Sequence, residues 1–226
     1  MENYFTLCAF ALFATACQPN NTTNATNTQN PQPKAAATQT TQVTQNLPST
    51  PSPKPSKSPP LVASARSQIG ITTGYDPNYR NLAFPMGDVD KSTGVCTDVI
   101  IRAYREQRQD LQALVNTDMK KAWQAYPKTW GLSKPDSNID HRRVPNLEVF
   151  FSRQGKSLST TDKTSYQAGD IVTWRLDQNG QKLPHIGIVS DTTTADGTPL
   201  IIHNIGRGAE ESDILYQFPI IGHYRY

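Results

Sequence analysis

The chain has 226 residues, which is enough for one folded domain with additional segments. Its formal net charge is +3. Residues 1–60 contain three lysines and one glutamate, so the 22 basic and 19 acidic residues of the whole chain leave a balance of +1 for residues 61–226. A nearly neutral domain lacks the basic surface that binds nucleic acid, and we expect no nucleic-acid partner.

The first segment, residues 1–16, has the features of a secretory signal. Its apolar run from Tyr4 to Ala16 covers about a dozen residues, fewer than the ~20 that a membrane-spanning helix needs. The run ends in Ala-Thr-Ala-Cys at 14–17, which is typical of bacterial lipoproteins whose cysteine is lipidated and becomes the new N-terminus. We interpret Cys17 as a lipid anchor in the bacterial envelope. Gln18 in place of an aspartate favours the outer membrane. The alternative is ordinary secretion with cleavage nearby.

The next segment, residues 17–60, consists mainly of Asn, Thr, Gln, Pro, Ser and Ala. Such a composition buries too little apolar surface to offset the entropy of ordering, so we predict a disordered tether. Cys8 belongs to the signal and Cys17 to the anchor. Cys96 is therefore the only thiol in residues 61–226, and no internal disulfide is expected there.

Residues 61–226 are predicted to form one domain with helices first and strands last. Apolar periodicity predicts helices over 61–68, 96–107, 111–126 and from Pro145 through Phe151. Loops are expected over 71–93 and 128–144. Runs rich in β-branched residues predict strands over 170–176, 185–191, 199–204 and 220–226. This order is typical of an α+β fold with an antiparallel sheet.

Cys96 stands where a polar loop gives way to a helix. A thiol at a helix N-terminus is pushed toward thiolate, so we expect its pKa to fall well below the ~8.5 of a free thiol. With His185 as a base, and His203 or Asn204 as an orienting group, the chain holds the parts of a cysteine nucleophile. Alternation along the strand lets only one of His203 and Asn204 face the thiol. Taken singly, each of these residues also fits a structural role.

Five segments resemble the bacterial domain-of-unknown-function family 1287. They are GVCTDVIIRAYR (94–105), NIDHRRVPNL (138–147), GDIVTW (169–174), HIGIV (185–189) and GHYR (222–225). That family belongs to the papain-like superfamily, beside the NlpC-type cell-wall peptidases. The resemblance implies a papain-like, NlpC-like fold in which a nucleophile at a helix N-terminus packs on a small antiparallel sheet.

The resemblance also implies roles for single residues. Cys96 would be the nucleophile, His185 the base and His203 the group that orients it, with Asn204 as the alternative because an amide fills that role in papain. A tyrosine that helps to form the oxyanion hole in NlpC-type enzymes would fall near Phe84, which cannot donate a hydrogen bond. Tyr75 or Tyr79 would then supply the hydroxyl beside the backbone N–H of Cys96.

The cluster Asp140-His141-Arg142-Arg143 has two interpretations. Arg142 and Arg143 can clamp the carboxylates of a peptide substrate. Alternatively, Asp140 and an arginine form a structural ion pair that fixes the loop. No pair of metal-ligating residues has the short spacing of a zinc site, so we expect no metal and no cofactor.

These expectations combine into one functional hypothesis. The protein would be a monomeric, lipid-anchored cysteine hydrolase that cleaves an amide bond in the stem peptides of peptidoglycan through a thioester acyl-enzyme. Two alternatives stay open. One is a non-catalytic lipoprotein that binds peptidoglycan or a protein, and the other is an acyltransferase on the same fold.

Overall fold

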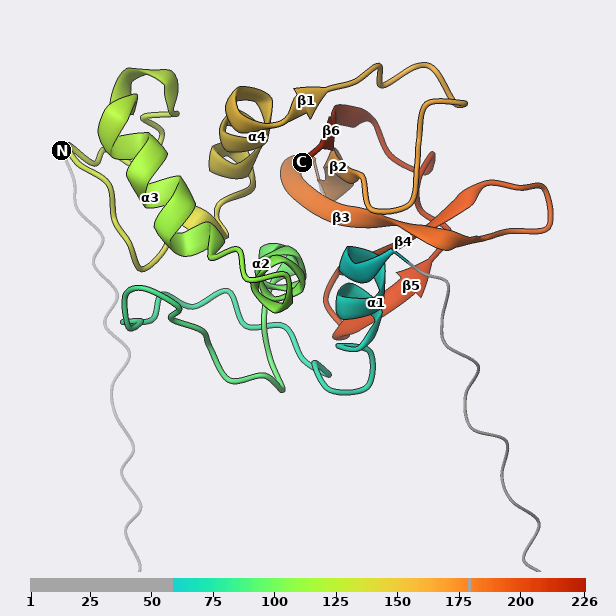
Figure 1. The fold of residues 1–226 in the computed structure, drawn as a ribbon, viewed down its shortest axis with the longest axis horizontal. Coiled ribbons are helices and arrows are strands. Elements are labelled where there is room, and N and C mark those ends of the chain that lie inside the picture. Colours follow the sequence, from blue (N-terminus) through green and yellow to red (C-terminus); the bar gives the residue numbers. More distant parts are fainter. Residues whose placement is uncertain (1–58, 179) are drawn as a thin grey trace, which may run out of the picture. The chain divides into compact units, whose positions relative to one another are not determined.

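Figure 1 shows the fold in a computed structural model, which describes residues 59–178 and 180–226. The predicted signal at 1–16, the anchor Cys17 and the tether up to residue 58 lie outside the described residues. The helices are α1 (Pro60–Arg66), α2 (Cys96–Glu106), α3 (Leu111–Lys121) and α4 (Val144–Gln154), with 3-10 turns η1 (Trp123–Ala125) and η2 (Asp140–Arg142). The strands are β1 (Lys156–Ser157), β2 (Ile171–Gln178), β3 (Gln181–Thr193), β4 (Pro199–Asn204), β5 (Ala209–Ser212) and β6 (Ile220–Arg225).

The strands form one antiparallel sheet in the order β1-β6-β2-β3-β4-β5. Strands β2 and β3 make a long hairpin in which Trp174 lies opposite His185. Strands β3 and β4 pair at Ile188 with Ile202 and at Val189 with Ile201. The α+β class and the antiparallel sheet are confirmed. No helix in the described part of the chain is both long and apolar enough to cross a bilayer.

Side chains alternate between the two faces of the sheet along each strand. Each face is covered by an apolar cluster. Ile186, Ile188 and Ile202 pack with Val99 and Ile100 of α2. The opposite face has its own cluster, formed by Val172, Trp174, Val189 and Ile201 with Ile214 and Leu215 from the segment after β5. Figure 1 shows α2 end-on between α3 and α1. Helix α2 is therefore the central helix, in contact with α1, α3, η2, β3 and β4.

The predicted helix over 111–126 was too long, since α3 ends at Lys121. Ala122 leaves the helical conformation with φ −134° and ψ 43°, and η1 follows. The physical reason is Asp118, whose buried carboxylate accepts hydrogen bonds from the Tyr126 hydroxyl at 2.7 Å and from Arg153 Nε at 2.7 Å. The chain has to turn back on itself to bring Tyr126 to that carboxylate.

The predicted strands differ from the structure in the bounds of some strands and in the absence of two short ones from the prediction. Strand β4 spans Pro199–Asn204 as expected, but β3 begins at Gln181 because its hairpin with β2 continues beyond the apolar run. Strands β1 and β5 were not predicted. The sequence of β5 is Ala-Glu-Glu-Ser, which lacks an apolar alternation, and its pairing with β4 is what makes it a strand.

Candidate functional site

Cys96 is the first residue of α2, and its side chain is buried with 5% of the residue exposed. The backbone N–H groups of Ile186, Thr97 and Cys96 lie near the sulfur and act to lower the pKa of the thiol. Because the Ile186 nitrogen belongs to the peptide bond that follows His185, the thiol lies directly beside that bond. The N-terminus of α2 at Cys96 thus lies against β3 at His185 and Ile186, where the buried part of that strand begins.

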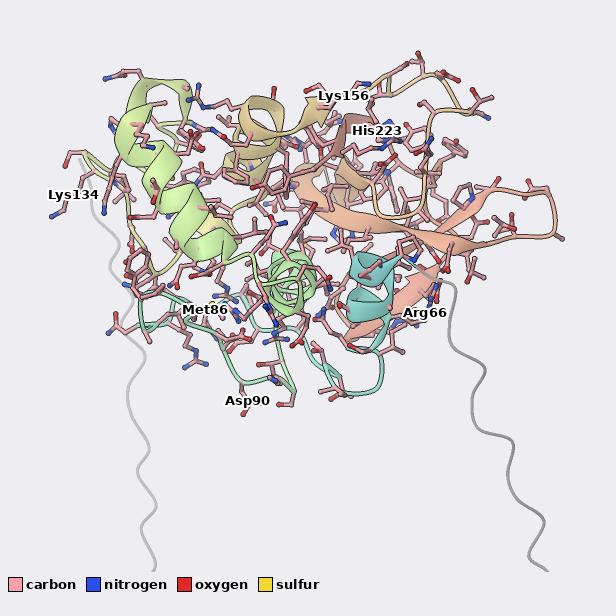
Figure 2. All side chains as sticks on the ribbon, viewed as in Figure 1. Arg66, Met86, Asp90, Lys134, Lys156 and His223 are labelled. Carbon is pink, nitrogen blue, oxygen red and sulfur yellow. The ribbon has the colours of Figure 1, made fainter. Side chains whose placement is uncertain are left out.

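The loop before Cys96 is fixed by an arginine of α2. Arg102 donates to both carboxylate oxygens of Asp88 at 3.0–3.2 Å and to the carbonyl oxygens of Val89, Asp90 and Thr93. Asp98 accepts from the N–H of Val95 at 2.6 Å and so caps the helix. Its role is structural, as is that of Asp88. Figure 2 shows the projecting loop that carries Asp90.

The two candidate histidines meet at the sheet. Nε2 of His185 lies 3.1 Å from Nδ1 of His203, and the two rings are perpendicular with centroids 5.1 Å apart. Both side chains are buried. Gly187 lies between them in the sheet, and a Cβ there would come within 2.4 Å of the Ile201 side chain and 3.3 Å of the His203 Cβ. The glycine therefore allows the close approach of β3 and β4 at this point.

Asn204, the alternative orienting residue, has other partners. Its amide nitrogen donates to the carbonyl oxygens of Gly74 at 3.1 Å and Gly94 at 3.2 Å. Its amide oxygen accepts from the N–H groups of Gly206 and Gly208. The structure places His203 against His185, and it places Asn204 where it ties three loops together beside the start of α2.

The pKa of the Cys96 thiol differs from expectation. Burial raises it to about 12, and the hydrogen bonds from Ile186 and Thr97 only partly oppose that rise. A helix terminus contributes at most ~2 kcal/mol, or about 1.5 pKa units, whereas burial shifts a pKa by up to ~3–5 units. The expected thiolate was wrong for this ligand-free state because burial is the larger effect.

The histidines are neutral as well. Burial lowers the pKa of His185 to about 3, helped by the neighbouring His203, and lowers that of His203 to about 4. Within residues 59–178 and 180–226, no hydrogen bond joins the Cys96 thiol to the His185 ring. The site thus holds a neutral thiol and two neutral imidazoles.

A cleft of about 290 Å³ opens at Cys96. Its polar and aromatic lining comes from Tyr75, Trp130, Arg142 and Arg143. The rest is apolar and consists of Pro77, Val95, Ile139, Val144, Pro145, Leu183 and Pro184. No aspartate or glutamate lines this cleft among the described residues. A ligand here meets apolar walls and cationic groups next to the thiol.

The structure separates the two candidate tyrosines. Tyr75 lines the cleft, and burial together with the nearby Cys96 raises the pKa of its hydroxyl to about 12. The hydroxyl of Tyr79 instead donates to the Asp136 carboxylate at 3.2 Å and accepts from Asn138 at 2.8 Å, outside the cleft. Tyr75 is the one placed near the thiol.

The two arginines of the 140–143 cluster have different environments. Arg142 is buried and makes two bonds of 2.9 Å to the carboxylate of Asp98. Arg143 donates to Asp140 at 2.9 Å, and its guanidinium lies 4.0 Å from the centre of the Trp130 ring. The structural ion pair with Asp140 is present, and it involves Arg143. The partner of Arg142 is Asp98 instead.

The family of this chain follows from comparison with known sequences. A family model described as "Domain of unknown function (DUF1287)" matches residues 62–226, which is most of the chain. The chain belongs to the DUF1287 family. A protein of Escherichia coli (strain K12) named "Uncharacterized protein YijF" is 60% identical over 167 residues, which cover 74% of this chain and 80% of that protein. All five resembling segments lie within the matched residues.

Three residues around the DUF1287 site were not found from the sequence. Ser212 and Glu210 lie next to His203 on β5, a strand that the pattern did not indicate. Trp130 lies in a loop without periodicity, and its contact with Arg143 arises only from folding. Across the described ranges, no group of three or more His, Cys, Asp or Glu side chains is arranged to hold a metal ion.

We expect the Asp98–Arg142 pair to be essential for the stability of this region. Asp98→Ala leaves the Arg142 guanidinium buried without its partner, which should lower the free energy of unfolding by about 3–5 kcal/mol. Urea unfolding at pH 7 measures this. The exposed pair Asp76–Arg80 provides the control, since Arg80→Ala should change stability far less. Equal effects of the two substitutions would contradict the prediction.

Proposed function

We propose that this DUF1287 domain is an envelope-anchored cysteine hydrolase of the papain-like, NlpC type, which cleaves an amide bond in peptidoglycan. The observation that carries the proposal is the convergence of three elements: the thiol at the start of α2, the peptide bond of His185 beside it, and His203 in contact with the His185 ring. Cys96 is one of the residues that line the cleft, so a substrate bound there would lie next to it.

The proposed reaction has two halves. The Cys96 sulfur attacks the amide carbonyl while its proton passes to His185, and the resulting imidazolium then protonates the leaving amine. A water molecule, deprotonated by His185, next hydrolyses the thioester and regenerates the thiol. Because the ligand-free thiol and imidazole are neutral, the proton moves during attack rather than before it. The N–H of Cys96 and the hydroxyl of Tyr75 are the candidates for stabilising the oxyanion.

The lining of the cleft supports an anionic peptide as the substrate. Arg143 makes one ion pair, to Asp140, and stacks on Trp130, so its planar guanidinium is held in one orientation. A guanidinium held in this way suits recognition of a carboxylate, which stem peptides carry. Arg142 is less suited to this role because both of its bonds to Asp98 are already made.

One observation favours a non-catalytic alternative. The raised pKa of the Cys96 thiol also fits a buried structural cysteine in a domain that binds peptidoglycan without cleaving it. Incubation of purified peptidoglycan with the full-length protein, followed by mass spectrometry, separates the possibilities. Hydrolysis gives fragments whose summed mass exceeds the parent by one water. Acyl transfer gives products that carry an added amine, and binding leaves every mass unchanged.

The anchor is a separate part of the proposal, and Cys17 lies outside the described residues. Cys17→Ser removes the thiol that would carry the lipid, so the protein should move from the membrane fraction into the soluble envelope fraction. Cell fractionation with immunoblotting measures this. Cys8→Ser is the matched control, because Cys8 belongs to the predicted signal and should have no effect on attachment. A Cys17→Ser protein that stays as firmly bound as the parent would show that there is no lipid anchor.

A further inference from the structure

His203 has a second polar contact on the side away from His185. Its Nε2 atom lies 2.7 Å from the hydroxyl oxygen of Ser212 and 3.7 Å from a carboxylate oxygen of Glu210. Both partners come from β5. The histidine is fully buried, whereas Ser212 and Glu210 are partly exposed on the edge strand. The chain of contacts thus runs from His185 through His203 to Ser212.

A neutral histidine carries one proton on its two ring nitrogens. The hydrogen bonds from His185 through His203 to Ser212 can therefore be arranged in only two ways. In the first, His185 Nε2–H donates to His203 Nδ1, and His203 Nε2–H donates to the Ser212 oxygen. In the second, every donor is reversed: the Ser212 hydroxyl donates to His203 Nε2, and His203 Nδ1–H donates to His185 Nε2. Only the first arrangement leaves Nδ1 of His185 unprotonated and able to accept a proton.

The Glu210 carboxylate distinguishes the two arrangements. A negative charge 3.7 Å from Nε2 of His203 favours a proton on that nitrogen and disfavours a lone pair there. Glu210 is also paired with Arg207 at 3.4 Å, but Arg207 is exposed and its interaction is weakened by water. The charge next to the buried ring therefore acts in favour of the first arrangement.

We infer that Ser212, assisted by Glu210, is a positioning residue that holds His203 and through it His185 in the tautomer that can accept a proton at Nδ1. The catalytic meaning of this inference rests on the proposed function, whereas the tautomer itself does not. When His185 accepts the thiol proton during attack, its Nε2–H keeps donating to His203. The new positive charge is then stabilised by a neutral ring whose own proton points to Ser212.

Strand β5 is held firmly enough for this role. Its register against β4 places Glu210 opposite His203 and Ser212 opposite Ile201. Arg66, labelled at the end of α1 in Figure 2, makes two bonds to the carboxylate of Glu211 at 3.0 and 2.9 Å. A bidentate bond of this kind fixes the strand between Glu210 and Ser212.

The tautomer can be measured directly in the unmodified protein. The chain has four histidines, so ring 15N shifts and long-range couplings of the full-length protein at pH 7 can be assigned by single substitutions. We expect the Nε2–H form for both His185 and His203. An Nδ1–H form of His203 would overturn the inference, and this result needs no variant that might fail to fold.

Variants then test what Ser212 does. Ser212→Ala should turn His203 into a mixture of tautomers and lower kcat/KM on a soluble peptidoglycan fragment by roughly tenfold, as expected for loss of one partly buried hydrogen bond, with KM nearly unchanged. Ser212→Thr keeps the hydroxyl and should restore both. Ser165→Ala is the control, since the Ser165 hydroxyl donates to the carbonyl oxygen of Asp162 at 2.7 Å, in the loop before β2 and without contact to β5.

The positioning role of Ser212 and the hydrolase activity can be rejected separately. If Ser212→Ala leaves both the tautomer and kcat/KM unchanged, Ser212 has no positioning role. If the unmodified protein releases no product from peptidoglycan but shows Nε2–H on both rings, and Ser212→Ala changes that state, the proposed hydrolase is wrong while the assignment to Ser212 stands.

Discussion

Cys96→Ala should abolish amide hydrolysis and leave the fold intact. The sulfur is the only nucleophile that the proposed mechanism provides, so we expect the rate of product release to fall by roughly 10³-fold or more. His185→Ala should cause a comparable loss, and the double variant should be no worse than either, because residues that act as one unit are not additive. The readout is the rate at which new amino groups appear in digested peptidoglycan.

Stability measurements separate this outcome from a structural cysteine. Cys96→Ala removes one buried atom at the start of α2, next to the cleft, so the melting temperature should change by only a few degrees. His141→Leu is the matched control for the histidine variant, because His141 is buried in η2 and contributes no group to the proposed reaction. Unchanged product release by Cys96→Ala, together with a large loss of stability, would reject the hydrolase.

Reactivity of the thiol adds a readout that does not depend on substrate. Since burial raises the pKa of Cys96 to about 12, little thiolate is present at pH 7 in the ligand-free protein. Alkylation of Cys96 by iodoacetamide should therefore be slower than that of a free cysteine, and it should still be rising at pH 9. Fast alkylation at pH 6 would mean that the effect of the helix terminus on the thiol pKa outweighs that of burial.

Local signals in the sequence were enough to predict the helix that begins at Cys96 and the strand that contains His185. The change from a polar loop to apolar periodicity at Cys96 marks a helix start, and the β-branched run after His185 marks a strand. The α+β order followed from the same signals. These features depend on neighbours a few residues apart, which the sequence displays directly.

Features that depend on distant neighbours could not be found in this way. The end of α3 at Lys121 depends on Asp118 meeting Arg153, which is 35 residues away. The partner of Arg142 is Asp98, at a separation of 44 residues, whereas the ion pair that the sequence suggested for Asp140 is local and is made by Arg143. Strand β5 exists because β4 lies beside it, so its contacts to His203 were not predictable from Ala-Glu-Glu-Ser.

The pKa of the Cys96 thiol could not be predicted from its position in the sequence. A helix N-terminus does lower the pKa of a thiol, and the N–H groups that do so are present at Cys96. The opposing effect, burial under β3 and the loop before α2, is created by the tertiary structure. In a hydrolase of this design, part of the substrate-binding energy must serve to deprotonate the sulfur.

Acid should destabilise the folded protein well above the pH at which carboxylates titrate. Burial lowers the pKa of His141 and His185 to about 3 and that of His203 to about 4. In the unfolded chain these groups have the ordinary value of ~6.5. Below pH ~6.5 these histidines are therefore protonated in the unfolded state and neutral in the folded state. The free energy of unfolding is at its full value above that pH and decreases as the pH falls toward 4.

The size of this loss is large compared with the total stability. At pH 5 each of the three histidines should lower the free energy of unfolding by about 2 kcal/mol, hence by about 6 kcal/mol together. The free energy of unfolding of a typical protein is ~5–15 kcal/mol. Burial raises the pKa of Asp140, which acts in the opposite direction, but it is a single group. Urea unfolding of the full-length protein at pH 7, 6 and 5 should show the midpoint falling steadily.

His141→Leu identifies the source of the acid sensitivity. His141 is 2% exposed, and its Nδ1 atom is buried without a hydrogen-bond partner, so an apolar side chain should be tolerated at pH 7. Removing one of three equivalent groups should reduce the slope of stability against pH between 6 and 5 by about one third. Product release at pH 7 should be unchanged. If the slope is the same in His141→Leu and the parent, protonation of His141 does not contribute to unfolding in acid, and equal contributions from the three buried histidines are ruled out.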